Sequence, residues 1–285
     1  MASWRTNIAG RSGTKMVRRS QATAGIGFAV AAVLVVLGVT MSLPAQAQNV
    51  QAEKLKPEVS AFVARMAQEH GFDAIELGRL FAPLEPNQTI IRAFSTPATA
   101  KPWSYFRKLY VTPSRIDGGV AFWKAHADVL ERARATYGVP EEIIVSIIGV
   151  ETIYGQYTGN FRIVDALYTL GFEVPRRSKF FQGQFEHFLL LTRENGLDPE
   201  TLTGSFAGAI GIPQFMPSSY RQYAVDFDGD GRSDLSNSVA DAVGSVAHYL
   251  SRFGWEDGQE IVLPAKVSTN ETETLKRLGV KPALT

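Results

Sequence analysis

A single carboxylate, Glu151, lies in the segment GVETIYG, residues 149–155, at the end of the apolar helical run PEEIIVSIIGVE. With helical spacing, Ile143, Ile147 and Glu151 fall at i, i+4 and i+8, so the glutamate is predicted to lie on the apolar side of a helix. A carboxyl that loses its hydration there has a raised pKa, which is the condition a general acid needs near neutral pH. The same position suits a structural glutamate that caps a neighbour or pairs with an arginine, and position alone does not separate the two.

Glycosidases that use two carboxylates need a second Asp or Glu near the scissile bond. Glu173 in GFEVPRR and Glu186 in QFEHF are candidates by residue type only. Three histidines, His126, His187 and His248, fit no metal-binding or triad spacing. The sequence also contains no G-x-S-x-G, Walker A or dinucleotide-binding motif. Residue types and spacing alone therefore leave both a catalytic and a structural role open for Glu151.

An aspartate-rich segment, DFDGDG, runs from Asp226 to Gly231. It places oxygen ligands at alternate positions and a glycine at the sixth, as an EF-hand loop does. The twelfth position is Asn237, where the strict pattern has a bidentate glutamate. The segment predicts a bound divalent cation, most simply calcium, and the alternative is a solvated Asp-Gly turn.

The composition is that of a globular protein without a strong electrostatic bias. Of 285 residues, 45% are apolar and 20% are charged, and 29 Lys and Arg against 28 Asp and Glu give a net charge of +1. No general basic field is available for nucleic acid. The absence of cysteine excludes disulfides, thiolate metal sites, a cysteine nucleophile and a lipidated cysteine.

Residues 1–47 are predicted to be a signal peptide. Two arginines precede an uncharged run, residues 24–43, and the following PAQAQN fits a small-residue cleavage site after Ala47. Cleavage would leave Gln48 as the first residue of a protein soluble in the periplasm. The alternative is a retained membrane anchor, since about 20 apolar residues can span a bilayer.

Helical periodicity dominates the rest of the chain. A first helix is predicted to end at Gly71, and Asp73 fits as the N-cap of a second, short helix. The buried stripe of the first helix is predicted to be Val59, Phe62, Val63 and Met66. Residues 84–102 contain three prolines and are predicted to form a loop.

A longer helix is predicted from about Ser114 to Gly138, and the next helix opens at Pro140. The inward positions of the longer helix are predicted to be Ile116, Val120, Trp123, Ala127 and Leu130. Two further helices fit residues 178–195 and 239–253, and QEIVLPAKV, residues 259–267, is the only good strand signal. The predicted fold class is mainly α, with a small, truncated β element at the C-terminus.

Four segments, in this order, closely resemble the membrane-bound lytic murein transglycosylase B family. They are YGVPEEIIVSIIGVETIYG, DALYTLGFEVPRR, GSFAGAIGIPQFMPSSY and YAVDFDGDGRSDL with DAVGSVAHYL. The match runs from about residue 53 to Trp255, and several long, uncommon motifs in register are a specific signal. The resemblance implies a lysozyme-like helical domain over residues 48–255, with an EF-hand-like loop, followed by a partial β element and tail over residues 256–285.

The family cleaves peptidoglycan between N-acetylmuramic acid (MurNAc) and N-acetylglucosamine (GlcNAc), leaving 1,6-anhydromuramoyl ends. By this resemblance one carboxylate, Glu151, suffices and no cofactor is required for the chemistry. The acid protonates the glycosidic oxygen and then takes a proton from the sugar's own C6 hydroxyl, which closes the ring. The 2-acetamido group is thought to stabilise the cationic centre, as a second carboxylate does elsewhere.

Substrate-binding positions also follow from the resemblance. They are Ser205, Gln214, Phe215, Arg176, Arg177, Tyr249 and Phe106. Ser205 matches a serine near the substrate acetamido group, and the arginine pair matches one that binds glycan and peptide. Phe106 stands where the family has a tyrosine, so a hydroxyl contact is lost or replaced there. For Phe215 and Tyr249, ordinary core packing is the alternative.

The resemblance further implies a structural calcium site in the aspartate-rich segment. Asp226, Asp228 and Asp230 would donate side-chain oxygens, Arg232 its backbone carbonyl, and Asp241 the closing carboxylate. The expected partners are peptidoglycan glycan strands and proteins of cell-wall synthesis or remodelling, without nucleic acid, and a membrane only if the N-terminal segment is retained.

Three functions from the residues and the resemblance stay open. The first is an exported lytic transglycosylase. The second is a hydrolytic muramidase, which needs a base such as Glu173 or Asp165 in the cleft. The third is a catalytically impaired peptidoglycan-binding protein, because the chain ends at Thr285 without the family's C-terminal cleft segment.

Overall fold

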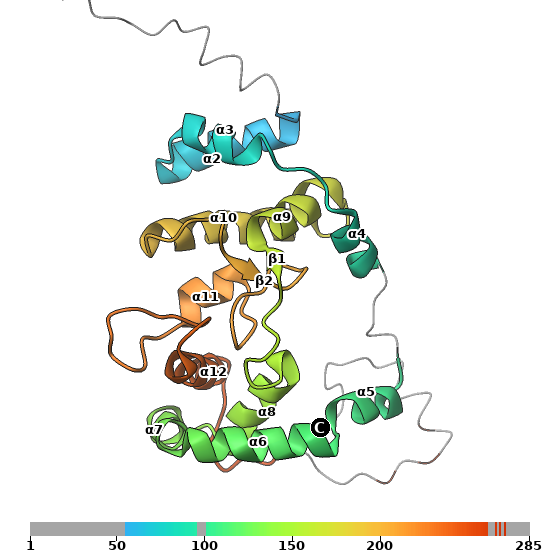
Figure 1. Cartoon of the computed structure of the whole chain (residues 1–285), viewed down its shortest axis with the longest axis vertical. Coiled ribbons are helices and arrows are strands. Elements are labelled where there is room, and N and C mark those ends of the chain that lie inside the picture. Colours follow the sequence, from blue (N-terminus) through green and yellow to red (C-terminus); the bar gives the residue numbers. More distant parts are fainter. Residues whose placement is uncertain (1–54, 96–100, 262–265, 267, 269–270, 272–285) are drawn as a thin grey trace, which may run out of the picture. The chain divides into compact units, whose positions relative to one another are not determined.

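The computed structural model describes residues 55–95, 101–261, 266, 268 and 271. Its elements are α2 (Pro57–His70), α3 (Ala74–Phe81), α4 (Gln88–Ser95), α5 (Trp103–Tyr110), α6 (Pro113–Ala125), α7 (Ala127–Tyr137), α8 (Glu141–Thr152), β1 (Phe161–Arg162), α9 (Ile163–Tyr168), the π-helical turn η2 (Thr169–Glu173), α10 (Ser178–Glu194), β2 (Thr203–Gly204), α11 (Pro217–Tyr223) and α12 (Val239–Arg252). The mainly α fold class is therefore confirmed (Figure 1).

The first helix forms as its sequence predicts. Pro57 occupies the first helical turn, and Gly71 ends the helix in the left-handed region at φ 66°. All four residues of the predicted stripe are buried: Val59, Phe62, Val63 and Met66. The carboxylate of Asp73 accepts hydrogen bonds from the N–H groups of Ile75 and Glu76, so the predicted N-cap of α3 is also confirmed.

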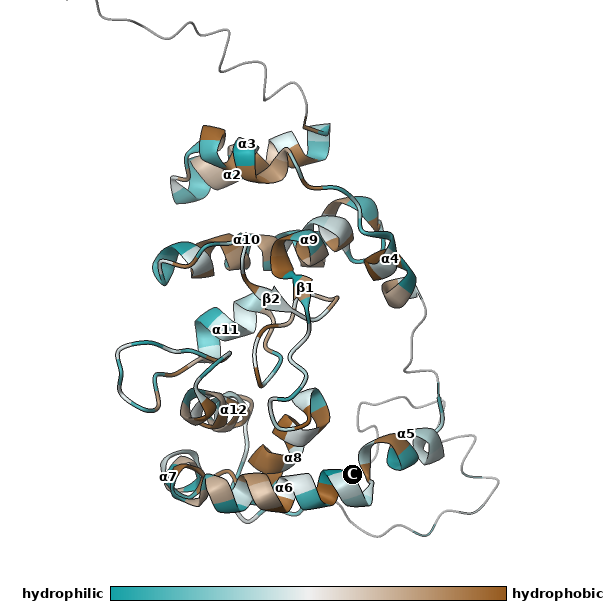
Figure 2. Cartoon of the chain, viewed as in Figure 1, coloured by the Kyte–Doolittle hydropathy of each residue, from teal (hydrophilic) through white to brown (hydrophobic). Residues whose placement is uncertain are grey.

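Apolar side chains form two buried clusters within the described residues. The first cluster joins α2, α3, α9 and α10, and its centre holds aromatic rings such as Phe81 and Phe185, whose centroids lie 4.9 Å apart. The second cluster joins α6, α7, α8 and α12 around Leu130, Ile144 and Ile148. α8 is predominantly brown in Figure 2, in agreement with its place in the second cluster.

A glycine-rich segment, residues 203–216, connects the two clusters. Ile210 belongs to the first cluster and Ile212 to the second. β1 and β2 pair antiparallel, with Phe161 opposite Gly204, and two further bridges join Ile210 to Gly204 and to Phe215. A Cβ at Gly204 would lie 2.1 Å from the carbonyl oxygen of Ala209, so only glycine allows this close passage of the backbone.

The structure corrects two predictions about elements. Residues 88–95, predicted as part of a loop, form the helix α4, in which Ile90 is fully buried. The predicted helix from Ser114 to Gly138 is two helices, because the chain turns at His126, whose φ and ψ are −127° and 28°.

The inward face predicted for this region is also wrong in part. Leu130 is buried, but Ile116, Val120 and Trp123 are 55%, 47% and 36% exposed. Phe122 and Gly119 lie on the buried face of α6 instead. The three exposed residues do lie on one face of α6, as their spacing predicts, but this face lines an open cavity beside α5.

Two sequence predictions fall mostly outside the described residues. The signal peptide over residues 1–47 lies wholly outside them. Of the strand predicted over residues 259–267, the described Gln259, Glu260 and Ile261 are not in a strand. Among the described residues, no helix is long and apolar enough to cross a membrane.

Candidate active site

Glu151 lies in the last turn of α8, at the edge of the buried face of that helix. The buried residues of α8 are Ile144, Val145, Ile148, Gly149 and Thr152. Ile143 and Ile147 are half-buried and Glu151 is exposed. The prediction that Glu151 lies on the apolar side of the helix is therefore wrong in part. The neighbouring residue, Thr152, lies on the buried face, and the Glu151 side chain borders that face and reaches solvent.

Burial still raises the pKa of Glu151, because neighbouring atoms remove part of the hydration of its carboxyl. No described residue forms an ion pair with it. A desolvated carboxyl without a cationic partner holds its proton at a higher pH than an ordinary glutamate does. It is thus suited to act as a general acid.

The two other glutamates considered for catalysis are engaged elsewhere. Glu173 forms an ion pair with Lys56 at the start of α2. Glu186 accepts hydrogen bonds from Arg65 at 2.5 Å and from His70 at 2.9 Å. Burial raises the pKa of Glu186, but these hydrogen bonds outweigh it and lower the pKa overall. Both carboxyls are held in ion pairs with other residues, so neither is positioned as a base for Glu151.

The backbone after Glu151 makes an unusual turn. Ile153, Tyr154 and Gly155 all lie in the left-handed region, with φ of 52°, 60° and 84°. For an isoleucine and a tyrosine this conformation is strained and must be held by surrounding contacts. One such contact is made by Thr152, whose hydroxyl donates to the carbonyl of Ile212 at 2.8 Å and accepts from the N–H of Gly155 at 3.0 Å.

Three predicted substrate-binding residues lie on the glycine-rich segment that this turn contacts. The Ser205 hydroxyl oxygen accepts from the N–H groups of Ala207 and Ala209 at 3.3 and 3.0 Å. Gln214, with φ 53°, donates from its side-chain nitrogen to the carbonyls of Thr158 and Gly211. The Gln214 amide therefore ties this segment to the chain that follows Glu151.

Phe215 is buried and its ring packs on Tyr249, with centroids 5.5 Å apart. Tyr249 in turn packs on Tyr223 and Phe253, at 5.1 and 4.5 Å. These contacts are those of an aromatic cluster between α11 and α12. They fit the packing alternative for Phe215, whereas Tyr249 is half-buried and keeps part of its surface open to a ligand.

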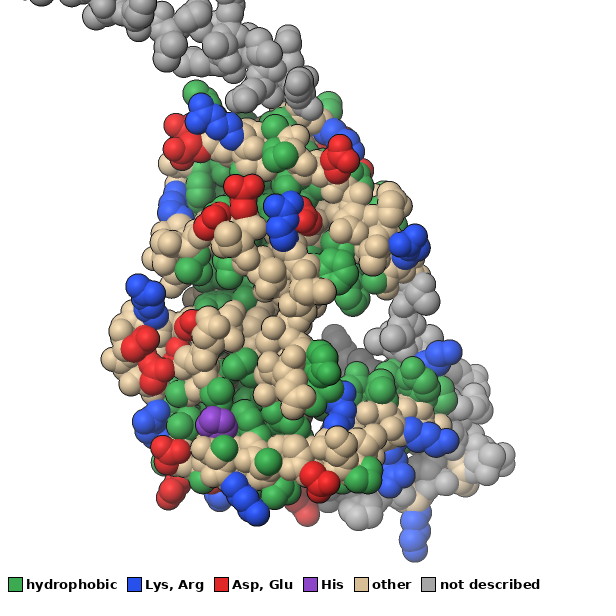
Figure 3. Space-filling view, in the orientation of Figure 1, with side chains coloured by type: hydrophobic (Ala, Val, Ile, Leu, Met, Phe, Trp, Pro, Cys, Tyr) green, Lys and Arg blue, Asp and Glu red, His purple; other side chains and the backbone are tan. Residues whose placement is uncertain are grey.

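Phe106 of α5 lines a cavity of about 600 Å³ together with Gly149, Val150 and Tyr154 of the α8 end. The same cavity contains the exposed stripe of α6, and hydrophobic side chains gather over α5 in Figure 3. The structure thus places Phe106 in the same cavity as the two residues that precede Glu151. Its ring also packs on Tyr105 and Tyr110.

Arg176 and Arg177 lie between η2 and α10 and are exposed. The Arg177 guanidinium lies over the ring of Phe180, 4.3 Å from its centroid. No described hydrogen bond joins either arginine to the turn after Glu151.

Sequence reasoning missed Thr152, Tyr154 and Arg115, which hold that turn, because no local pattern marks a left-handed isoleucine or tyrosine.

The aspartate-rich loop has the geometry of a cation site in part. Carboxylate oxygens of Asp226, Asp228 and Asp230 lie within 4.8 Å of one another. Three hard oxygen ligands at this spacing fit calcium. Asp226 accepts from three N–H groups of its own loop, those of Gly229, Asp230 and Gly231, which fixes its orientation.

Asp241 does not join that oxygen cluster. It is fully buried, and its two oxygens accept from the N–H groups of Phe227, Asp228 and Asp234. Burial raises its pKa, and the three backbone hydrogen bonds act in the opposite direction. Asp241 thus holds the loop backbone together, and its role as the closing ligand stays a prediction.

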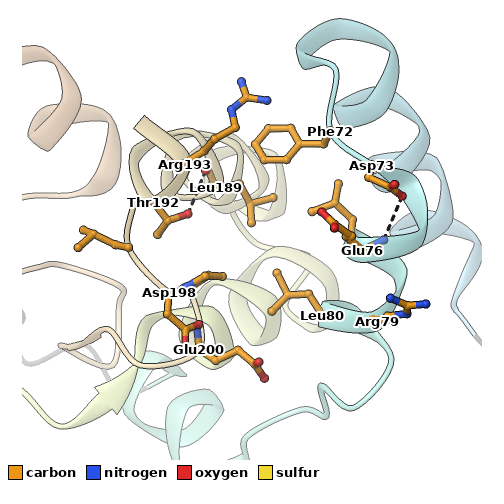
Figure 4. Close-up of a pocket in the computed structure, with 13 residues that line it drawn as sticks. Phe72, Asp73, Glu76, Arg79, Leu80, Leu189, Thr192, Arg193, Asp198 and Glu200 are labelled. Atoms are coloured by element: carbon orange, nitrogen blue, oxygen red, sulfur yellow. Dashed lines mark hydrogen bonds between the residues drawn. The ribbon is translucent and has the colours of Figure 1, made fainter. Parts of the chain in front are cut away.

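A second cavity, of about 460 Å³, lies between α3 and α10, away from the Glu151 turn (Figure 4). Its apolar lining includes Leu77, Leu80 and Leu189, and the Arg193 guanidinium lies over the Phe72 ring at 4.0 Å. None of the predicted site residues lines it. Its carboxylate Asp73 already serves as the N-cap of α3.

Comparison with known proteins decides the family. A model described as the transglycosylase SLT domain matches residues 54–283. The chain belongs to this family. It is 45% identical over 219 residues to the membrane-bound lytic murein transglycosylase B of Escherichia coli strain K12, a match that covers 73% of this chain. The chain spans 60% of the length of that relative.

Solved structures agree with this membership. The soluble lytic transglycosylase SltB1 of Pseudomonas aeruginosa is 48% identical, with a TM-score of 0.72 over 76% of this chain and 74% of that one. The Escherichia coli lytic transglycosylase Slt35 in complex with calcium is 40% identical, with a TM-score of 0.71 over 80% of this chain and 76% of that one. The family resemblance read from the motifs is confirmed.

Proposed function

We propose that the protein is a peptidoglycan lytic transglycosylase that cleaves the β-1,4 bond between MurNAc and GlcNAc. The observation that carries this proposal is the desolvated, unpaired carboxyl of Glu151 at the end of α8, in a chain that belongs to the SLT family. The similarity to a lytic murein transglycosylase supports the substrate class.

In the proposed reaction Glu151 acts first as an acid and then as a base. Its raised pKa favours the protonated carboxyl, which transfers a proton to the glycosidic oxygen as the bond breaks. The resulting carboxylate then takes the proton of the MurNAc C6 hydroxyl, whose oxygen bonds to C1 and forms the 1,6-anhydro ring. Glu173, Glu186 and Asp165 are engaged in ion pairs, which favours this route over hydrolysis with a second carboxyl as base.

The remaining predicted residues are proposed to hold the glycan. The exposed Arg176 and Arg177 would bind carboxylates of the peptide stem, and Ser205 and Gln214 would orient the acetamido group. Tyr249 and Phe106 would contact sugar faces. Phe215 would act mainly by packing Tyr249 in place.

Digestion of purified sacculi, followed by mass spectrometry of the released muropeptides, tests the proposal. We expect anhydromuramoyl ends from the wild-type protein and a loss of release of at least about 1,000-fold in Glu151→Gln, since that variant cannot transfer a proton. Lysis that survives the substitution would overturn the catalytic assignment. Reducing ends would indicate a muramidase, and binding without lysis in both proteins would indicate a binding protein.

We also propose that the aspartate-rich loop binds a structural calcium ion through Asp226, Asp228, Asp230 and the carbonyl of Arg232. The clustered carboxylate oxygens support this, as does the calcium complex of Slt35. Calcium is expected to raise the melting temperature of the chelated wild-type protein and to have no such effect on Asp228→Asn. A melting temperature that calcium leaves unchanged would argue against the site.

Export to the periplasm is proposed from the sequence of residues 1–47. The body of the protein, residues 48–255, would then act on glycan strands in that compartment, together with proteins of cell-wall remodelling. N-terminal sequencing of the mature protein should begin at Gln48. An unprocessed N-terminus would favour the membrane anchor.

A further inference from the structure

The ring of Tyr154 fills a slot between α6 and α8 that three glycines leave open. A Cβ on Gly149 would lie 2.7 Å from atoms of this ring, and one on Gly119 would lie 2.7 Å from its hydroxyl oxygen. A Cβ on Gly118 would lie 3.1 Å from a carbon atom of the Tyr154 ring. Such distances are at or below the limit of real carbon contacts, so the ring position requires the small residues on both helices.

Two hydrogen bonds join the same elements in opposite directions. The Tyr154 hydroxyl donates to the carbonyl of Arg115, near the start of α6, at 2.7 Å. The Arg115 guanidinium donates to the carbonyl of Gly149 on α8, also at 2.7 Å. Arg115, Gly149 and Tyr154 are called the clasp below. Because the pKa of Tyr154 is raised by burial, its hydroxyl remains a donor throughout the physiological range.

The clasp and Thr152 hold Glu151 from two sides. Thr152 attaches the end of α8 to Ile212 of the glycine-rich segment, and Tyr154 attaches it to α6. Glu151 precedes both residues in the same turn. The left-handed conformations of Ile153 and Tyr154 are strained, so the turn keeps its shape only while these contacts persist.

We propose that Tyr154 is a positioning residue for Glu151, whose ring and hydroxyl fix the last turn of α8 and thereby the direction of the carboxyl. The inference rests on the proposed function, in which Glu151 transfers the proton. Tyr154 itself does not touch the reacting atoms. It acts through the backbone of the turn.

Tyr154→Phe and Tyr154→Leu test the two parts of this role in the full chain. The phenylalanine variant keeps the ring and loses only the hydrogen bond to Arg115, whereas the leucine variant empties the slot. We expect kcat for muropeptide release to fall about 10-fold and about 100-fold, with KM within about twofold of wild type, since displaced catalytic groups act on kcat. Melting temperatures establish that both variants are folded.

Trp255→Phe provides a matched control. Trp255 also donates one side-chain hydrogen bond to a backbone carbonyl, that of Gly138, and packs in the same apolar cluster. It lies away from the Glu151 turn. We expect this variant to lower the melting temperature about as much as Tyr154→Phe does and to keep the wild-type kcat. A purely structural role for Tyr154 would make the two variants alike in kcat.

A second readout does not depend on turnover. Carbon-13 NMR titration of labelled glutamate carboxyls follows Glu151 directly, and the signal lost in Glu151→Gln assigns it. When the slot is emptied, the last turn of α8 should loosen and leave the carboxyl more fully hydrated, so the Glu151 titration midpoint should move to lower pH in Tyr154→Leu. The high-pH limb of the kcat profile should move in the same direction.

The outcomes separate the two proposals. If Glu151→Gln is inactive but both Tyr154 variants keep the wild-type kcat and the wild-type titration midpoint, the positioning role is wrong and the proposed function stands. If the wild-type protein releases no muropeptide, or Glu151→Gln is as active as wild type, the proposed function falls and the positioning role falls with it.

Discussion

Glu151 combines two properties that usually exclude one another, since it is exposed to solvent and its pKa is raised by burial. Its position at the border of the apolar cluster explains both. The outer part of the side chain can meet a glycan strand, while the atoms beneath it limit hydration. A carboxyl of this kind destabilises the folded protein when it is charged, because folding removes water from the anion.

That cost leads to a prediction about stability and pH. Since the folded pKa of Glu151 is raised, the folded protein holds more protons than the unfolded chain between the ordinary glutamate pKa and the raised one. Its stability therefore falls as pH rises through this window. Urea unfolding at about pH 4 and about pH 7 should show Glu151→Gln gaining stability relative to wild type at the higher pH.

The pKa of Glu194 is lowered, so its effect on stability changes with pH in the opposite direction, and Glu194 serves as the control. Arg221 donates to both of its oxygens, at 2.9 and 2.7 Å, and the hydrogen bonds lower its pKa. Stability from this pair is present above the ordinary glutamate pKa and is lost as pH falls. Glu194→Gln should therefore lose stability relative to wild type at the higher pH. A pH-independent difference for Glu151→Gln would contradict the desolvation of its carboxyl.

At the scale of elements, the contact between α6 and α8 is specified by glycines. Gly149→Ala should destabilise the protein by about 1–3 kcal/mol, because the new methyl group meets the Tyr154 ring. In the background of Tyr154→Ala the same substitution should be neutral or slightly stabilising, since alanine is the better helix former. Denaturant unfolding of the four proteins measures the coupling.

Gly183 is the matched control for this cycle. It also lies inside a helix, α10, but a Cβ there would meet nothing within 4 Å. Gly183→Ala should stabilise the protein by up to about 1 kcal/mol. Equal effects of Gly149→Ala in both backgrounds would show that the ring does not occupy the slot.

Several helices could be predicted from sequence because their apolar residues recur with one face of a helix. α10 and α12 agree with their predicted bounds within a residue, and α2 ends where its end was predicted. α4 could not be predicted, since prolines on both sides of residues 88–95 indicated a loop and only Ile90 of this segment is fully buried. The exposed stripe of α6 shows that apolar spacing predicts a face but not what the face contacts.

At the scale of the molecule, the described body consists of two apolar clusters joined by residues 203–216. Ile210 and Ile212 enter different clusters on either side of Gly211, which has φ 73°. A Cβ at Gly211 would lie 2.4 Å from the carbonyl oxygen of Leu235, and the Ile212 N–H donates to that same carbonyl. A glycine at position 211 is therefore required for the backbone to turn from the first cluster into the second.

Gly211→Ala should destabilise the protein by more than about 2 kcal/mol, because both the backbone conformation and the space exclude a Cβ. It should also loosen the attachment of Thr152 to Ile212 and so reduce muropeptide release per folded molecule. Thermal unfolding and the sacculus digest measure the two effects. Gly196→Ala, at a left-handed glycine with open space around it, should cost less and leave release unchanged.

The candidate site was predictable only where residue type carries the chemistry. A glutamate at the end of an apolar helical run and an alternating run of aspartates can be found in one sequence. The residues that hold the Glu151 turn in place could not be predicted from the sequence. Arg115 and Tyr154 are 39 positions apart and act through backbone carbonyls, so their types give no sign of the contact.

The left-handed isoleucine at position 153 bears on how this protein should be engineered for heat tolerance. Glycine or asparagine would adopt the conformation of Ile153 more readily, so a search for stabilising substitutions would select this position early. The same replacements would add freedom to the turn that carries Glu151. Thermostable variants are therefore better sought on the exposed faces of α2 and α10, where backbone relaxation does not reach the proposed acid.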